Sequence, residues 1–119
     1  MGAFTVSLQV GDLARRQFIP VDNILVDTET AYSMFPESML TQLGIEQEGC
    51  RWFKLADNRV VEYPVGHACI RLQGNELTAL VVFAPDNTSL LLGFTALETF
   101  GLGLDTVNQR LVPVPGLLK

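Results

Sequence analysis

The stretch Ile24-Leu25-Val26-Asp27-Thr28-Glu29-Thr30 runs from three apolar residues directly into an acidic, hydroxyl-rich segment. The apolar residues predict a buried strand that ends at Val26. The carboxylate of Asp27 therefore starts in a poorly solvated environment, where it needs hydrogen-bond donors or a proton shared with another acid. Two interpretations follow: Asp27 caps backbone amides at a strand end, or it is a catalytic acid.

Around this stretch, apolar residues recur mostly at every second position, which is the period of a half-buried strand. Strands separated by turn residues are expected over Phe4–Val10, Arg16–Val26, Trp52–Ala56, Arg59–Val65, His67–Leu72, Leu77–Phe83 and Leu90–Leu92, followed by extended segments at Leu102–Asp105 and Leu111–Val114. Pro20 predicts an edge or a bend in the second strand, because proline lacks an amide donor. The apolar run 77–83 predicts a central strand.

Two short helices are expected between these strands. Residues 36–44 begin with proline, carry an acid near the start and end at Gly44. Residues 95–101 end in the same way at Gly101. Short strands with two brief helices predict a mostly β domain that forms a small closed or partly open barrel, with one domain spanning residues 1–119.

Composition narrows the classes of partner. The chain has 119 residues, of which 48% are hydrophobic and 18% charged, and its formal net charge is −5 with the basic residues scattered. A nucleic-acid partner is therefore not expected. Neither is a membrane partner, and the predicted location is the cytoplasm. Cys50 and Cys69 predict two ordinary thiols, at least one of them buried, because two cysteines make no disulfide framework or metal pattern.

A second apolar run, Leu90-Leu91-Leu92-Gly93, repeats the strand–turn–helix order of Ile24–Leu43 without the acid. The motifs that follow one another along the chain are Leu25-Val26-Asp27-Thr28, Tyr32-Ser33-Met34-Phe35-Pro36, Leu43-Gly44-Ile45, Leu55-Ala56-Asp57-Asn58-Arg59-Val60, and Leu91-Leu92-Gly93 with Leu97-Glu98. This ordered set resembles the retropepsin-like aspartic proteases, in their small bacterial and archaeal single-domain form. The resemblance runs from Phe4 to about Pro113.

The resemblance implies a retropepsin-like half-barrel that works as a symmetric homodimer, with one catalytic aspartate per chain and no cofactor or metal. It implies that Asp27 is the catalytic acid, that Thr28 braces the dimer, and that Thr30 occupies a position where the family accepts a small residue. The hairpin at Asp57, Asn58 and Arg59 corresponds to the flap that closes over an extended peptide substrate. Gly93 corresponds to the turn behind the catalytic loop, and Asp105 to a structural position in the closing segment.

Glu29 departs from the family pattern Asp-Thr-Gly, because a side chain replaces the glycine. An aspartic endopeptidase and an inactive dimeric binding module of the same fold both remain open for this reason. A third hypothesis is a hard-cation site built from Asp27 and Glu29 of two chains. His67 is expected to be a satisfied structural residue, and Trp52-Phe53 to lie in the core or at the flap base, with one ring possible in a substrate pocket.

Overall fold

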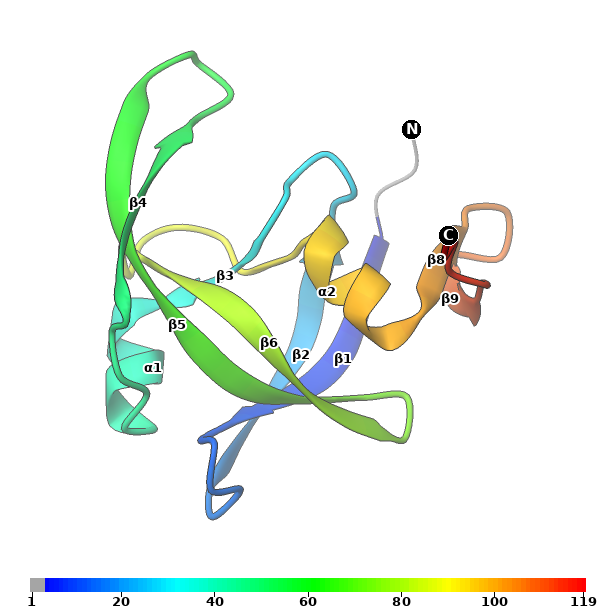
Figure 1. Ribbon diagram of the computed structural model, residues 1–119, viewed down its shortest axis with the longest axis horizontal. Helices are drawn as coiled ribbons and strands as arrows, with labels where there is room; N and C mark the ends of the chain where they lie inside the picture. The colour runs from blue at the N-terminus through cyan, green and yellow to red at the C-terminus, as the bar shows by residue number, and fades with distance from the viewer. Residues whose placement is uncertain (1–3) are drawn as a thin grey trace.

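The computed structural model describes residues 4–119, which form one seven-stranded sheet, a separate two-stranded sheet and two short helices (Figure 1). The elements are β1 (Phe4–Gly11), β2 (Phe18–Val26), β3 (Ser33–Pro36), α1 (Glu37–Gln42), β4 (Gly49–Lys54), β5 (Val60–Leu72), β6 (Asn75–Ala84), β7 (Leu91–Leu92), α2 (Phe94–Phe100), β8 (Leu102–Asp105) and β9 (Arg110–Pro113). The mostly β fold class predicted from the sequence is confirmed.

The large sheet has the order β1-β2-β7-β3-β6-β5-β4, and an additional pairing of β1 with β5 closes it on itself. This closure uses only the last residues of β1, Gln9 to Gly11, which pair with Cys69 to Arg71. β6 lies between β5 and β3, as its nearly continuous apolar run predicts. Among residues 4–119, β4 pairs with β5 alone and therefore forms the outer edge of the sheet.

The alternating pattern of β1 buries Phe4, Leu8 and Val10, as its sequence predicts. The inner faces of the strands and both helices together form one core, whose largest fully buried side chains include Phe35, Phe83, Ile24, Leu40, Ile70, Leu92 and Leu97. Burial of each such side chain contributes about 1.5–3 kcal/mol relative to exposure. The core therefore fixes the ends of the strands from which the loops extend.

Three details of the strands differ from the sequence-based expectation. β5 is one continuous strand across Gly66, because β4 pairs with its first half and β6 with its second, so the two strands predicted there are a single element. β2 begins at Phe18, two residues later than expected, whereas the edge position predicted for Pro20 is confirmed, because β7 pairs with the end of β2 at Leu25 and Val26. The irregularity of β2 lies at Asn23, which has a φ of 62°, near a register shift against β1. β3 was not anticipated.

Both helices were predicted close to their observed bounds. α1 follows Pro36 and is closed by Gly44, which has a φ of 73°. α2 ends at Gly101, whose φ of 67° is the left-handed conformation that glycine adopts without a steric penalty. α2 covers the sheet near β3 and β6 and leads into β8, which carries the chain to the small β8–β9 hairpin at the right of Figure 1.

Candidate active site

The segment of residues 27–32, here called the Asp27 turn, leaves the sheet where β2 ends. The Asp27 amide donates to the carbonyl oxygen of Leu92 at 3.1 Å, which continues the parallel pairing of β2 with β7. The half-buried Asp27 carboxylate then receives two hydrogen bonds from its own turn. The Glu29 amide donates to Oδ1 at 2.9 Å, and the Thr30 hydroxyl donates to Oδ2 at 3.1 Å. Both carboxylate oxygens are therefore oriented by local donors, as in a capping turn.

Glu29 fits this turn without the special torsions of glycine. The non-glycine residues with positive φ among residues 4–119 are Arg15, Asn23, Asn58, Gln73 and Gln109, so the backbone of Glu29 lies in an ordinary region. Its side chain is exposed and makes no side-chain hydrogen bond or ion pair within residues 4–119. The backbone amide of residue 29 thus orients Asp27 whether or not a side chain is present.

Gly93 supports the Asp27 turn from behind. Its amide donates to the buried Ser33 hydroxyl at 3.0 Å. The next two amides, those of Phe94 and Thr95, donate to the carbonyl oxygens of Thr30 at 2.8 Å and Ala31 at 2.9 Å. A Cβ at position 93 would lie 2.5 Å from the carbonyl carbon of Tyr32, so only glycine fits between these backbones.

The hairpin of β4 with the first half of β5, residues 49–65, is here called the flap hairpin. The flap hairpin (green) and the Asp27 turn (cyan) both extend from the same side of the barrel, at the top of Figure 1. Its tip is closed by backbone bonds between Leu55 and both Asn58 and Arg59, and Asn58 has a φ of 70°. Arg59 donates to Asp57 from its amide and from Nε, and these bonds lower the pKa of Asp57.

Aromatic contacts join the flap hairpin, close to its tip, to the Asp27 turn. The rings of Tyr32 and Phe53 meet edge to face with centroids 6.0 Å apart, and Phe53 also lies 6.3 Å from Tyr63. Nη1 of Arg51 donates to the Tyr32 hydroxyl at 3.2 Å. The sequence analysis quoted Tyr32 within a motif but did not predict this contact or single out Arg51, because the two residues are 19 positions apart.

No family model and no curated protein matches the sequence. Solved structures do match the fold. A retropepsin-like aspartic protease from Rickettsia conorii has a TM-score of 0.53 and 14% identity, over 87% of this chain and 82% of that one. Simian foamy virus (mac) protease has a TM-score of 0.51 and 15% identity, over 79% and 93% of the two chains.

The chain has the retropepsin-like fold. A third structure, the foamy viral protease-reverse transcriptase in complex with an RNA/DNA hybrid, matches at a TM-score of 0.55 and 14% identity over 96% of this chain. This chain spans 13% of the length of that protein. At identities of 14–15%, these structural matches show the retropepsin-like architecture alone. Any chemical function therefore has to be argued from the residues of the site.

Trp52 and Phe53 lie on opposite faces of β4. Phe53 is half-buried near the tip of the flap hairpin, where it pairs with Val61, whereas Trp52 points to the opposite face of β4 and is 68% exposed. The expectation of a core or flap-base position is therefore wrong for both residues. Trp52 is exposed because successive residues of a strand face opposite sides, and Phe53 lies outside the core and close to the tip of the hairpin. His67 has a partner, because its Nδ1 lies 2.9 Å from the Glu48 carboxylate.

The remaining predicted positions are structural or lie apart from the turn. Asp105 accepts hydrogen bonds from Asn108 and Arg110 in the β8–β9 hairpin, and these bonds lower its pKa. Cys69 is buried and Cys50 is exposed, as expected for ordinary thiols. In residues 4–119 no group of three or more His, Cys, Asp or Glu side chains is arranged to hold a metal ion. Over the same range no helix is long and apolar enough to cross a membrane.

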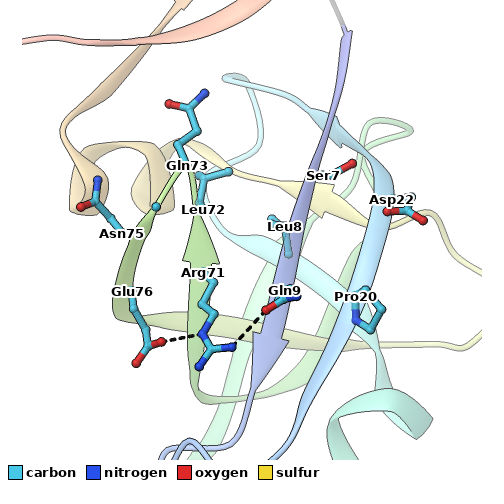
Figure 2. A pocket seen from close by; sticks show the side chains of 11 residues that line it. Ser7, Leu8, Gln9, Pro20, Asp22, Arg71, Leu72, Gln73, Asn75 and Glu76 are labelled. Atoms are coloured by element: carbon cyan, nitrogen blue, oxygen red, sulfur yellow. Dashed lines mark hydrogen bonds and ion pairs between the residues drawn. The ribbon is translucent and has the colours of Figure 1, made fainter.

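One cavity lies beside the Asp27 turn, and another lies apart from it. One, of about 320 Å³, is lined by Thr28 of the Asp27 turn and by apolar residues of α2 and β8. The other, of about 440 Å³, lies between β1, β2 and the β5–β6 hairpin and contains no residue of the Asp27 turn (Figure 2). Its Arg71 bonds to Glu76 and Gln9 at 2.5 and 3.2 Å, so the main charge of this second cavity is already neutralised.

Proposed function

We propose that the protein is an aspartic endopeptidase that acts as a homodimer, with Asp27 of each chain in one shared site. The observation that carries this proposal is the Asp27 carboxylate, half-buried at the end of a strand with both oxygens oriented by its own turn. The turn faces a flap hairpin within a retropepsin-like fold. A simple capping role requires neither the flap nor the contacts that join it to the turn.

A single chain supplies one carboxylate, so the proposed site requires a second copy. The surface beside Asp27 suits such a contact: Thr28 is exposed and lines the 320 Å³ cavity with Leu102 and Leu104. Phe94, which lines the same cavity, is 45% exposed, and Val107, in the turn between β8 and β9, is 88% exposed. Exposed apolar side chains are stabilised when a partner covers them. In the proposed dimer, Thr28 hydrogen-bonds across the twofold axis.

The reaction follows from two carboxylates brought close together. Two such groups about 3 Å apart do not both ionise, so the pair holds one proton. The ionised carboxylate removes a proton from a water molecule, which attacks the carbonyl carbon of the peptide bond. The protonated carboxylate hydrogen-bonds to the carbonyl oxygen, and proton transfer to the amide nitrogen then releases the amine. General acid and base assistance of this kind accelerates a reaction about a hundredfold to ten-thousandfold.

The substrate lies extended between the Asp27 turn and the flap hairpin. An extended peptide forms main-chain hydrogen bonds with strand edges, and side-chain pockets select its sequence. Within the part of the chain that the structure describes, β4 offers an unpaired edge, because it pairs there with β5 alone. Peptide bonds in extended segments are therefore the proposed substrate class.

The decisive experiment measures peptide-library cleavage from about pH 3 to 8 for the native chain and for Asp27→Asn. We expect kcat to fall by about a hundredfold or more in Asp27→Asn, because the general acid–base pair is lost. Asp22→Asn is the matched control, since Asp22 is an exposed acid on the same strand. Unchanged cleavage by Asp27→Asn would contradict the proposal, as would sedimentation as a monomer at all accessible concentrations.

The competing function is a dimeric binding module without activity. The presence of Glu29 favours this alternative, since a symmetric pair brings two further carboxylates to the Asp27 pair. The variant Glu29→Gly separates the two functions. Cleavage by the native chain supports the enzyme, whereas cleavage that appears only in Glu29→Gly supports a protein that has lost its activity.

A further inference from the structure

Arg51 is a fixed cation beside the Asp27 turn, and it has no acidic partner among the described residues. Arg15, Arg59, Arg71 and Arg110 each form an ion pair with a carboxylate, but Arg51 forms none within residues 4–119. It is held instead by Tyr32, through the hydrogen bond from Nη1 at 3.2 Å and through the ring, whose centroid lies 5.6 Å from the guanidinium carbon. The charge is thus positioned but not neutralised.

The unused donors of this pair point to a carboxylate ligand. Nε and the second terminal nitrogen of Arg51 make no hydrogen bond within residues 4–119, and the Tyr32 hydroxyl serves there only as an acceptor. A guanidinium edge with two free N–H groups binds a carboxylate in a bidentate manner. The Tyr32 hydroxyl proton adds a further donor beside that edge.

The position of Arg51 places this binding group on the substrate side of the flap hairpin. Arg51 and Phe53 both contact Tyr32, so they lie on the face of β4 that is turned toward the Asp27 turn. Trp52 and Lys54 alternate with them and face the other way. A peptide lying between the turn and the flap hairpin therefore passes Arg51.

We propose that Arg51, oriented by Tyr32, selects peptide substrates that carry an acidic side chain, Asp or Glu, at a position removed from the bond that is cut. This inference rests on the proposed peptidase function. The acidic side chain binds away from the reacting bond, since Asp27 and Glu29 repel it there. In a symmetric dimer two Arg51 residues flank the site, so acidic residues are selected at two positions, one on each side of the bond.

The test uses an octapeptide library in which one position at a time is fixed as Glu, Gln or Lys. The native chain is expected to favour Glu over Gln by roughly threefold to tenfold in kcat/KM at one or more positions, as for a partly exposed charged hydrogen bond. The preference falls between about 0.1 M and 1 M salt, because the screening length shortens from about 10 Å to about 3 Å.

Charge reversal distinguishes recognition from a structural contact. Arg51→Glu is expected to favour Lys at the same position, Arg51→Gln to have no charge preference, and Tyr32→Phe to have a weaker one. Lys54→Glu is the matched control, with the same charge change on the opposite face of β4, and it keeps the native preference. Equal kcat/KM for the Glu, Gln and Lys peptides would overturn the proposal, as would a preference that Arg51→Gln retains.

Binding to Asp27→Asn separates this inference from the proposed function. Fluorescently labelled members of the same library are titrated onto that variant, and anisotropy reports binding without cleavage. If Asp27→Asn binds peptides with charge selectivity while the native chain cleaves none of them, the Arg51 site is supported and the peptidase function is contradicted. Cleavage without charge selection contradicts the Arg51 site alone, and absence of both binding and cleavage contradicts both proposals.

Discussion

The two strand–turn–helix units of the chain lie side by side and differ in their turns. β2 and β7 are adjacent and parallel, and each leads toward a short helix. After β2, the Asp27 turn and β3 separate strand from helix, and the turn exposes Thr28 and Glu29. After β7, only Gly93 stands between strand and helix, and it is buried against the first turn. The first unit is open and carries the acid, while the second is closed and holds the first in place.

The glycine requirement also differs between the two turns. Residue 93 must be glycine because of the approach of the Tyr32 backbone, although its own φ of −91° is accessible to any residue. Residue 29 has an ordinary backbone and an exposed side chain, so Glu is accommodated in the single chain. Close packing thus constrains the supporting turn more strongly than the turn that carries Asp27.

The largest expected effect is that of Gly93→Ala. The new Cβ meets backbone atoms that have no room to withdraw, so we expect the free energy of unfolding to fall by about 3 kcal/mol. Denaturant unfolding measures this change. Gly116→Ala is the control, since a Cβ there meets nothing within 4 Å. Equal stability of the two variants would show that the second turn is not closed in this way.

Ser33→Ala tests the hydrogen bond that links the two turns. Ser33 is 1% exposed, and its hydroxyl accepts a hydrogen bond from the amide of Gly93, which lies 60 positions away in the sequence. Its removal leaves a buried amide without an acceptor, and we expect a loss of about 1–2 kcal/mol in unfolding free energy. Thermal or denaturant unfolding detects this loss, and the exposed Ser89→Ala serves as the reference. Amide exchange at Gly93 should accelerate in Ser33→Ala only.

Glu29→Gly is expected to have the smallest effect on stability. The backbone amide that orients Asp27 is retained, so the folded state changes little, while the unfolded chain gains freedom worth about 0.5 kcal/mol. Comparison with Glu29→Ala in the same unfolding experiment isolates that entropy. A gain of several degrees in melting temperature for both variants would mean that the Glu29 carboxylates repel one another or Asp27 in the assembled protein.

Much of the fold follows from local patterns in the sequence. The alternation in Phe4–Val10, the helix termini at Gly44 and Gly101, and the tight turn at Asn58 depend on neighbouring residues, and the structure agrees with each. β3 was missed because four residues provide too short a period to recognise. The closure of the barrel by β1 and β5 was not assigned either, since such pairings join distant segments.

The sequence alone was sufficient for the strand that ends at Asp27 and for the mostly β class, because the order of apolar and polar residues dictates which faces are buried. The likeness to the retropepsin-like fold came from the ordered set of motifs and not from this periodicity. The sequence did not contain the ordinary backbone and exposed side chain of Glu29 in the single chain, the need for glycine at 93 or the contact of Arg51 with Tyr32. Those features arise where β7 inserts beside β2 and where the flap hairpin meets the Asp27 turn. Distances between segments far apart in the chain are set by packing, and local patterns do not encode them.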